Sequence, residues 1–278
     1  MRVSRRQFLS LAGATVAAGG VGYSWKVEPH WLEVTTCELP VRGLPRDLNG
    51  LTLLQLSDIH VGPRVDDAYV TSVFERAAAL RPDIVVVTGD LVSYHEHVFE
   101  QMERVYRCFP RGRMATLGVL GNHDYGPGWS HPEIAERIVA IAHGCGITML
   151  RNQAHEVEGL QIVGFDDLWA NRFDPSVALG DCDHSRPAIA LSHNPDTVDL
   201  PGWEHFHGWI LSGHTHGGQC RPPFLPAPLV PVRNRRYTQG EFALTGARTL
   251  YINRGVGHLL PVRFNVRPEL TVFELRQV

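Results

Sequence analysis

Five short groups of metal-binding side chains stand out in this sequence, because each follows directly on an apolar run. They are Asp58 with His60, Asp90, Asn122 with the adjoining His123 and Asp124, His193, and His214 with His216. Imidazole, carboxylate and carboxamide groups without thiolate suit manganese, iron or zinc better than calcium or Cu(I). The pattern therefore predicts a site for divalent metal ions, built from separate loops.

Two of these groups place their side chains two residues apart. In extended backbone such side chains point the same way, so Asp58 with His60, and His214 with His216, are each expected to converge on one point. Taken singly, each fragment also fits an ordinary turn or helix cap. All of them in order, each after a predicted strand, favour one shared crevice at the carboxyl ends of the strands.

The elements that must position these loops follow from the periodicity of the chain. Short β-branched or leucine-rich runs predict strands at 51–57, 84–89, 114–121, 160–165, 188–192, 208–213, 249–253 and 270–275. Apolar residues at three- and four-residue spacing predict helices over 66–80, 96–108 and 132–143. This alternation is typical of a layered α/β protein, and we expect one domain over residues 50–278, preceded by a connecting segment over 28–49.

The first 27 residues are set apart as a signal or anchor segment. The stretch SRRQFLS resembles a twin-arginine export motif, and a weakly apolar, charge-free stretch follows it. We expect the protein to be exported across, or anchored to, the cytoplasmic membrane of a bacterium, with the twin-arginine export machinery as a partner. Cleavage, retention and membrane association through this segment stay open, because no small-residue cleavage site follows the apolar stretch.

Composition narrows the class of protein further. With 278 residues, 44% hydrophobic and 20% charged, the chain belongs to the globular class. A net charge of −3 gives no general attraction for nucleic acid, so no nucleic acid partner is implied. The 5 cysteines show no CxxC pairing, which argues against a disulfide framework or a thiolate zinc site. The proline-rich, apolar segment 221–231 is expected to be an ordered covering loop.

The motifs DIH, GD, GNHD, a single histidine and GHTH, in this order from Asp58 to His216, resemble those of the calcineurin-like metallophosphoesterases. The twin-arginine start, LSHNPD, GHTHGGQ and YINRGVG make the chain most similar to exported bacterial phosphodiesterases of that family. The resemblance implies a four-layer α/β/β/α sandwich with two divalent metal ions between its sheets. It also implies hydrolysis of a phosphate ester, most simply a phosphodiester, by a hydroxide that the two metals activate.

Carried over residue by residue, the resemblance assigns each motif a role. The first metal would be held by Asp58, His60 and His216, the second by Asn122, His193 and His214, and Asp90 would bridge both. His123, next to Asn122 and pointing away from it, is the candidate to protonate the leaving oxygen, and Asp124 is the candidate to orient its ring. Arg254 is a weak candidate for binding the substrate anion, as is the cluster Arg233, Arg235 and Arg236.

Several alternatives stay open. In the runner-up hypothesis the protein is a UDP-2,3-diacylglucosamine-type pyrophosphate hydrolase, which acts on a lipid-linked substrate. A third hypothesis assumes no enzyme activity: the protein would be a catalytically idle metal-binding module of the cell envelope. Cys145 and Arg151 have the CxxxxxR spacing of cysteine phosphatases, but the apolar run between them favours a strand. No GxSxG elbow supports a serine hydrolase, and His95 and His97 are expected to face solvent.

Overall fold

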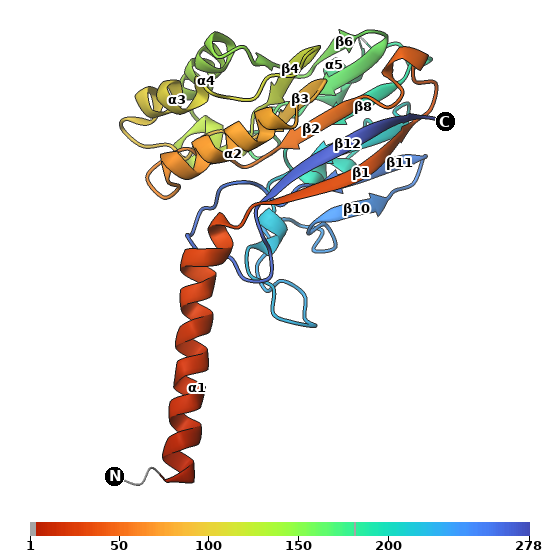
Figure 1. Ribbon diagram of the computed structural model, residues 1–278. Coiled ribbons are helices and arrows are strands. Elements are labelled where there is room, and N and C mark those ends of the chain that lie inside the picture. The colour runs from red at the N-terminus through yellow and green to blue at the C-terminus, as the bar shows by residue number, and fades with distance from the viewer. Residues whose placement is uncertain (1–3, 181) are drawn as a thin grey trace.

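The computed structural model describes residues 4–180 and 182–278, and within them two mixed β-sheets stack face to face (Figure 1). The first sheet has the order β1-β12-β2-β3-β4-β5 and the second the order β10-β11-β9-β8-β7-β6. The strands of the first are β1 Glu33–Val41, β12 Glu269–Gln277, β2 Thr52–Leu56, β3 Ile84–Thr88, β4 Ala115–Val119 and β5 Thr148–Met149. Those of the second are β10 Gly240–Ala243, β11 Arg248–Ile252, β9 Gly208–Ser212, β8 Ala188–Leu191, β7 Leu160–Gly164 and β6 Gln153–Val157.

Helices cover the outer face of each sheet. The first sheet is covered by α2 Asp67–Ala79, α3 Val98–Tyr106 and α4 Pro132–Gly144, and the second by α5 Pro175–Gly180 and the 3₁₀ turn η6 Pro195–Asp199. The predicted helices over 66–80 and 132–143 correspond to α2 and α4, and the one over 96–108 is observed as the shorter α3. The side chain of Asp66 accepts hydrogen bonds from the first backbone N–H groups of α2. Three apolar cores separate the layers.

Alternation along the central strands explains how one strand serves two cores. On β2, Leu54 packs under the helices of the first sheet, whereas its neighbour Leu53 packs between the two sheets. The second sheet repeats the pattern, since Ile162 on β7 faces the inter-sheet core and Val163 faces α5. The predicted four-layer α/β/β/α sandwich is confirmed.

The strands that precede the metal-binding motifs run parallel. β2, β3 and β4 form consecutive parallel pairs in the first sheet, and β8, β9 and β11 do so in the second. Parallel strands bring their carboxyl ends to the same edge of a sheet. The loops after five strands from two sheets therefore meet at one place.

Three of the described strands, β1, β6 and β10, lie outside every run that the sequence predicts. β1 falls within residues 28–49, which were expected to form a connection, and it pairs in parallel with β12 from Glu33↔Glu269 to Val41↔Gln277. It is an edge strand with several half-exposed residues, so it carries no continuous apolar run. The folded body thus includes residues that the predicted boundary at residue 50 left outside it.

The N-terminal helix α1, Arg5–Gly22, extends away from the layered body (Figure 1). Its first turn is closed by a capping box in which Ser4 and Gln7 bond each other's backbone. Phe8, Leu9 and Leu11 are exposed on it. Across the described ranges, the helices fall short of the length and apolar character that crossing a membrane requires.

Candidate metal centre

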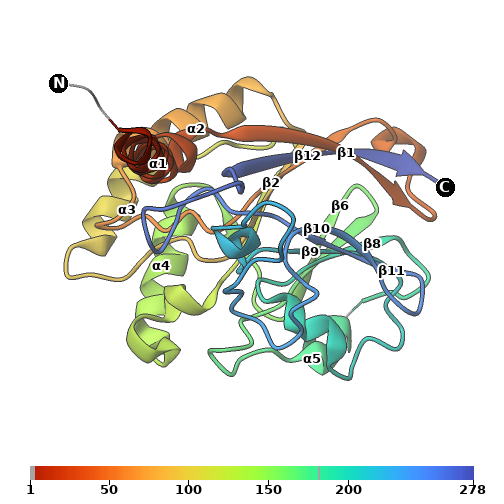
Figure 2. The same ribbon diagram turned by 90° about the horizontal axis from the view of Figure 1, so that it is seen from below.

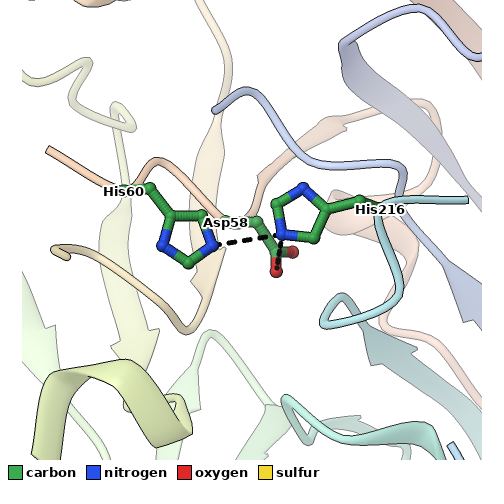
Figure 3. A group of neighbouring side chains, drawn as sticks. All are labelled: Asp58, His60 and His216. Atoms are coloured by element: carbon green, nitrogen blue, oxygen red, sulfur yellow. Dashed lines mark hydrogen bonds and ion pairs between the residues drawn. The ribbon is translucent and has the colours of Figure 1, made fainter. Parts of the chain in front are cut away.

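The first group of ligand-type side chains consists of Asp58, His60 and His216, which point toward one another (Figure 3). His216 Nε2 lies 3.2 Å from Asp58 Oδ1 and 3.1 Å from His60 Nε2. Asp58 and His60 follow β2, and His216 follows β9 of the other sheet. All three residues are buried, so their polar atoms face one another rather than solvent.

A second group consists of Asp90, His193 and His214. His193 Nε2 lies 3.2 Å from Asp90 Oδ2 and 3.2 Å from His214 Nδ1. Both histidines come from loops of the second sheet, and Asp90 comes from the loop after β3 of the first. The group therefore closes across the gap between the two sheets.

Asp90 joins the two groups. The same oxygen, Oδ2, that lies 3.2 Å from His193 Nε2 lies 3.5 Å from His60 Nε2 of the first group. A carboxylate between two sets of ligands allows two cations to sit close together, because its negative charge offsets their repulsion. The geometry fits the bridging role that the sequence predicted for Asp90.

Asn122 stands apart from the other candidate ligands in having no partner among the described residues. Its side chain is fully buried, and both its amide oxygen and its amide nitrogen lack a hydrogen bond. A buried, unsatisfied carboxamide costs about 1–3 kcal/mol. A metal ion bound to Oδ1 would give the amide oxygen its missing partner, so the donor set fits a cation here.

The backbone at these motifs differs from the extended conformation that the sequence interpretation assumed. Asp58, His60, Asp90, His214 and His216 all have positive φ, between 48° and 70°. Left-handed backbone is costly for residues other than glycine and clusters at functional sites. Asp58 and His60 do converge on one group, as expected, but left-handed backbone brings them together rather than strand alternation. The expectation that His214 and His216 converge on one point is wrong, since these two histidines enter different groups.

Neighbouring groups select which nitrogen of each histidine faces the centre. His193 Nδ1–H donates to the Thr88 carbonyl at 2.7 Å, and His214 Nε2–H donates to the Pro231 carbonyl at 2.8 Å. His60 Nδ1 lies 3.0 Å from Ser93 Oγ. Such outer partners fix the ring orientation and leave the other nitrogen free to bind a metal. No residue of this outer shell was predicted from the sequence, since nothing marks a serine or a carbonyl for it.

The charges of the centre reinforce each other. Burial alone would raise the pKa of Asp90, but His193 and His123 hold it well below its ordinary value. For His193 the signs are reversed: burial lowers the pKa of its imidazole, but the Asp90 carboxylate outweighs burial and raises that pKa to about 10. The carboxylates therefore stay ionised, and the space between them favours positive charge.

Comparison with known proteins agrees with this geometry. The model of the family described as calcineurin-like phosphoesterase matches residues 51–218. The chain belongs to this family. Phosphodiesterase YaeI of Escherichia coli is 32% identical over 98% of this chain and 99% of its own length. The uncharacterized metallophosphoesterase YkuE of Bacillus subtilis is 31% identical over 99% of the chain and 98% of its own length.

The chain is also similar to a relative that is named for a lipid-linked substrate. The UDP-2,3-diacylglucosamine pyrophosphatase LpxG of Chlamydia muridarum is 27% identical over 93% of this chain and 94% of its own length. The present chain is thus a metallophosphoesterase, a hydrolase acting on phosphate esters. The predicted resemblance to the family is confirmed.

His123 lies at the open side of this metallophosphoesterase centre. Its ring meets the His60 ring edge-to-face at 5.1 Å between centroids, and its backbone N–H donates to Asp90 Oδ1 at 2.9 Å. It also lines a hollow of about 290 Å³ with Ser93, Trp129 and others. The imidazole therefore contacts both the centre and the space from which a substrate would enter.

The role predicted for Asp124 is wrong. Its two carboxylate oxygens accept hydrogen bonds from the backbone N–H groups of Val92 and Gly121, at 3.1 and 2.8 Å, rather than from the His123 ring. Burial, with Asp90 nearby, raises its pKa well above the ordinary value. Asp124 therefore braces the loops that carry Asp90 and Asn122.

Arg254 is also placed differently from the prediction. Its guanidinium forms ion pairs of 2.9 Å with both Glu33 and Glu269, which tie β1 and β12 to the loop after β11. Two carboxylates already neutralise its charge, so it has little to offer a substrate anion. Arg233, in contrast, lines a second hollow of about 530 Å³, together with Trp129 and Trp169.

Two further features of the centre carried no signal in the sequence. Trp169 packs edge-to-face on the ligand-type His214, with centroids 4.4 Å apart, and stacks at a tilt on Trp129. Arg263 is fully buried and donates to the carbonyls of Arg254, Gly255 and Gly257. Neither residue belongs to a motif, and both are brought here by long-range packing.

The remaining candidates lie away from the centre. Arg151 pairs with Asp166 and Glu136, and β5 intervenes between it and Cys145, so no phosphate cradle forms there. His95 Nε2 lies 2.7 Å from Gln101 Oε1 within its own segment, and His97 is exposed. The prediction against a cysteine phosphatase agrees with this placement of Arg151, and of the two histidines expected to face solvent, His97 does so and His95 is half-buried.

Proposed function

We propose that this metallophosphoesterase is a phosphodiesterase that uses two divalent metal ions, with manganese, iron or zinc as candidates. Asp58, His60 and His216 would hold one ion, and Asn122, His193 and His214 the other. The observation that carries the proposal is the position of Asp90 Oδ2, at 3.5 Å from His60 Nε2 in one group and 3.2 Å from His193 Nε2 in the other. When bound, such a metal pair lowers the pKa of water and stabilises charge on phosphoryl oxygens.

The protein's own contribution to the reaction begins with His123. Its partly exposed ring lines the hollow of about 290 Å³, and its backbone is fixed by the hydrogen bond to Asp90. An imidazole in this position is suited to hold a proton for the oxygen that leaves phosphorus. The mechanism requires no covalent intermediate, so no side chain is assigned as a nucleophile.

The outer residues would keep the ligands in place during turnover. The Thr88 and Pro231 carbonyls accept hydrogen bonds from the outward N–H groups of His193 and His214, so each ring keeps one tautomer. Trp169 packs on the His214 ring and limits its rotation. A site held this way keeps its geometry without reorganisation when a phosphate ester enters.

We also propose that the protein acts outside the cytoplasm. The support is the SRRQFLS stretch at its start, which resembles a twin-arginine motif. Export by that machinery in the folded state would let the metal ions be loaded before export. Appending residues 1–40 to a reporter enzyme, with Arg5→Lys/Arg6→Lys as the control, would test it. A reporter that stays in the cytoplasm in both forms would contradict export.

The test of the proposed activity is the initial rate on a chromogenic phosphodiester and on its monoester, using the full chain with added Mn²⁺. Cleavage that favours the diester and disappears with a chelator is expected. An Asp90→Asn variant should lose the activity, and an Asp166→Asn variant, changed in a buried carboxylate that pairs with Arg151, should keep it. Preference for the monoester would contradict the phosphodiesterase assignment.

A second candidate is hydrolysis of the pyrophosphate bond in a UDP-diacylglucosamine-type lipid. Its support is the similarity to LpxG over 93% of the chain. Turnover of that lipid nucleotide much faster than of the chromogenic diester would favour it. A chain that binds two metals, gains thermal stability from them and turns over neither substrate would instead match the idle module.

A further inference from the structure

Large apolar side chains are left exposed on three segments beside the point where α1 leaves the body. Trp25, Val27 and Trp31 lie on the first segment, Phe224, Leu225 and Leu229 on the second, and Leu260 and Val262 on the third. Leu229 is 77% exposed and Leu260 61%, so these side chains do not contribute to a core. Segment 221–231 was expected to be a covering loop; this is wrong for Phe224, Leu225 and Leu229, which point outward, whereas Ala227 and Val230 are half-buried.

Hydrogen bonds join these segments into one surface. The backbone N–H of Arg263 donates to the Ser24 carbonyl at 2.9 Å, and the Arg267 guanidinium lies 3.7 Å above the Trp31 ring. On the other side, the N–H of Arg221 donates to the Phe264 carbonyl at 2.8 Å. Gln219 Nε2 donates to the carbonyls of Leu260 and Val262.

The charges on this surface have one sign. Residues 221–238 and 256–268 contain no aspartate or glutamate, but they include exposed arginines such as Arg221 and Arg235. In the first segment Lys26 is exposed, with its Nζ 4.8 Å from the Trp25 ring, whereas Glu28 is buried and accepts the N–H of Val266. Apolar side chains with tryptophan and basic residues among them are the composition of surfaces that bind anionic lipid.

We propose that this surface docks on an anionic lipid bilayer. We define the docking surface as Trp25, Val27, Trp31, Phe224, Leu225, Leu229, Leu260 and Val262. α1 leaves the body from the same side, and Figure 2 views the molecule from there, with α1 nearly end-on. The helix also carries Phe8, Leu9, Leu11 and Val21 exposed, so apolar side chains are exposed both on α1 and on the surface from which it leaves. Six of its eight residues lie beyond residue 27, so the docking is additional to any role of the N-terminal segment.

The docking surface borders the metal centre. Leu259, next to Leu260, lines the same hollow as His123, and the Arg64 guanidinium donates to the Leu259 carbonyl at 2.6 Å. At the other end of segment 221–231, the Pro231 carbonyl accepts the Nε2–H of His214. Docking would therefore hold the opening at His123 close to the headgroups, where a lipid phosphate ester would be within reach.

Vesicle binding by the full chain tests the proposal. Phe224→Ser/Leu229→Ser removes two side chains of the docking surface, and Leu80→Ser/Val177→Ser removes two exposed apolar side chains elsewhere. On phosphatidylglycerol vesicles, the docking variant should partition at least about tenfold more weakly than the wild type, and the control variant should not change. Both variants keep α1, so the difference between them reports on the docking surface alone.

Three outcomes would overturn the proposal. Equal binding by the docking and control variants would assign all vesicle binding to α1. Equal binding of the wild type to phosphatidylcholine and phosphatidylglycerol vesicles would remove the role of the basic side chains. Loss of self-association in the docking variant, with unchanged vesicle binding, would make a second copy of the chain the partner. Because the readout is binding, the result does not depend on the proposed phosphodiesterase activity.

Discussion

Gly255 lies directly against Asp58. A Cβ on Gly255 would come within 2.7 Å of the Asp58 Cβ and 3.3 Å of His216 Nδ1, and the residue has a φ of +71°. The loop it belongs to is bonded to the Asp58 segment, since the N–H groups of Val256 and Gly257 donate to the carbonyls of Ser57 and Asp58. The YINRGVG motif thus forms one wall of the first group of ligand-type side chains.

Gly255→Ala is expected to disturb that group selectively. The new methyl group would push against Asp58 and His216, so the bound metal should fall from about two ions per chain to about one. Elemental analysis of the purified protein measures this. Gly246→Ala is the matched control, because Gly246 has a similar φ of +74° but no neighbour closer than 3.8 Å. Two ions retained in Gly255→Ala would contradict the close packing.

Arg263→Met should destabilise the fold. The fully buried guanidinium donates to the carbonyls of Arg254, Gly255 and Gly257. Removing it costs the Arg254 and Gly257 carbonyls their donor, whereas the Gly255 carbonyl keeps the N–H of Glu269, so we expect a loss of about 2–3 kcal/mol. Urea unfolding measures the change. Arg113→Met removes the ion pair between an exposed arginine and the more buried Asp83, whose carboxylate keeps hydrogen bonds from Thr52, and should cost less than about 1 kcal/mol. Equal losses in both variants would argue against a structural role for Arg263.

His123→Ala tests the proton donor. With an alkyl leaving group, which needs a proton, kcat should fall about 10²–10⁴-fold at unchanged metal content. With a p-nitrophenyl leaving group, which departs as a stable anion, the fall should be much smaller. His95→Ala serves as the control, because His95 bonds only within its own segment among the described residues. The same fall for both leaving groups would point to a role in binding rather than in proton transfer.

Ser93→Ala probes the outer partner of His60. Ser93 Oγ lies 3.0 Å from His60 Nδ1 and helps to fix which ring nitrogen faces the centre. Its loss should weaken metal binding about 10- to 100-fold, as measured by titration of the metal-free protein. Ser72→Ala removes an exposed hydroxyl on α2 and is expected to leave the affinity unchanged.

Glu269 should make the free energy of unfolding depend on pH in the acidic range. Burial raises its pKa, but the ion pair with Arg254 outweighs this and lowers it below the ordinary 4.5. A carboxylate with a lowered folded pKa contributes its stability above the unfolded pKa and loses it as pH falls through the folded one. Glu269→Gln should therefore cost about 3 kcal/mol near pH 7, and the difference from wild type should shrink below about pH 4.5.

Thermal unfolding of both proteins between pH 7 and pH 3 measures that difference. Glu241→Gln, on the half-exposed strand β10, is the control and should behave like the wild type throughout. A constant difference between Glu269→Gln and wild type across this range would mean that the carboxylate contributes through packing alone.

The sequence alone determined the layered α/β class and the loops that carry the chemistry. Runs such as 84–89 are continuous and apolar because β3 is buried on both faces, which is what periodicity detects. Asp90 and Asn122 could be identified because each directly follows such a run. The spacing of His214 and His216 does not show that they belong to different groups of ligand-type side chains. That assignment came from the family resemblance.

Only the tertiary structure decided how these side chains meet. Left-handed backbone at Asp58 and His214 cannot be inferred from residue type, because neighbouring loops impose it. The partners of Asp124 and Arg254 are likewise set by segments distant in the chain, such as the N–H of Val92 and the carboxylate of Glu33. Local patterns predict which residues end a strand. Which of them gather in one ligand-type group, brace a loop or stay exposed depends on contacts that form only when both sheets have packed.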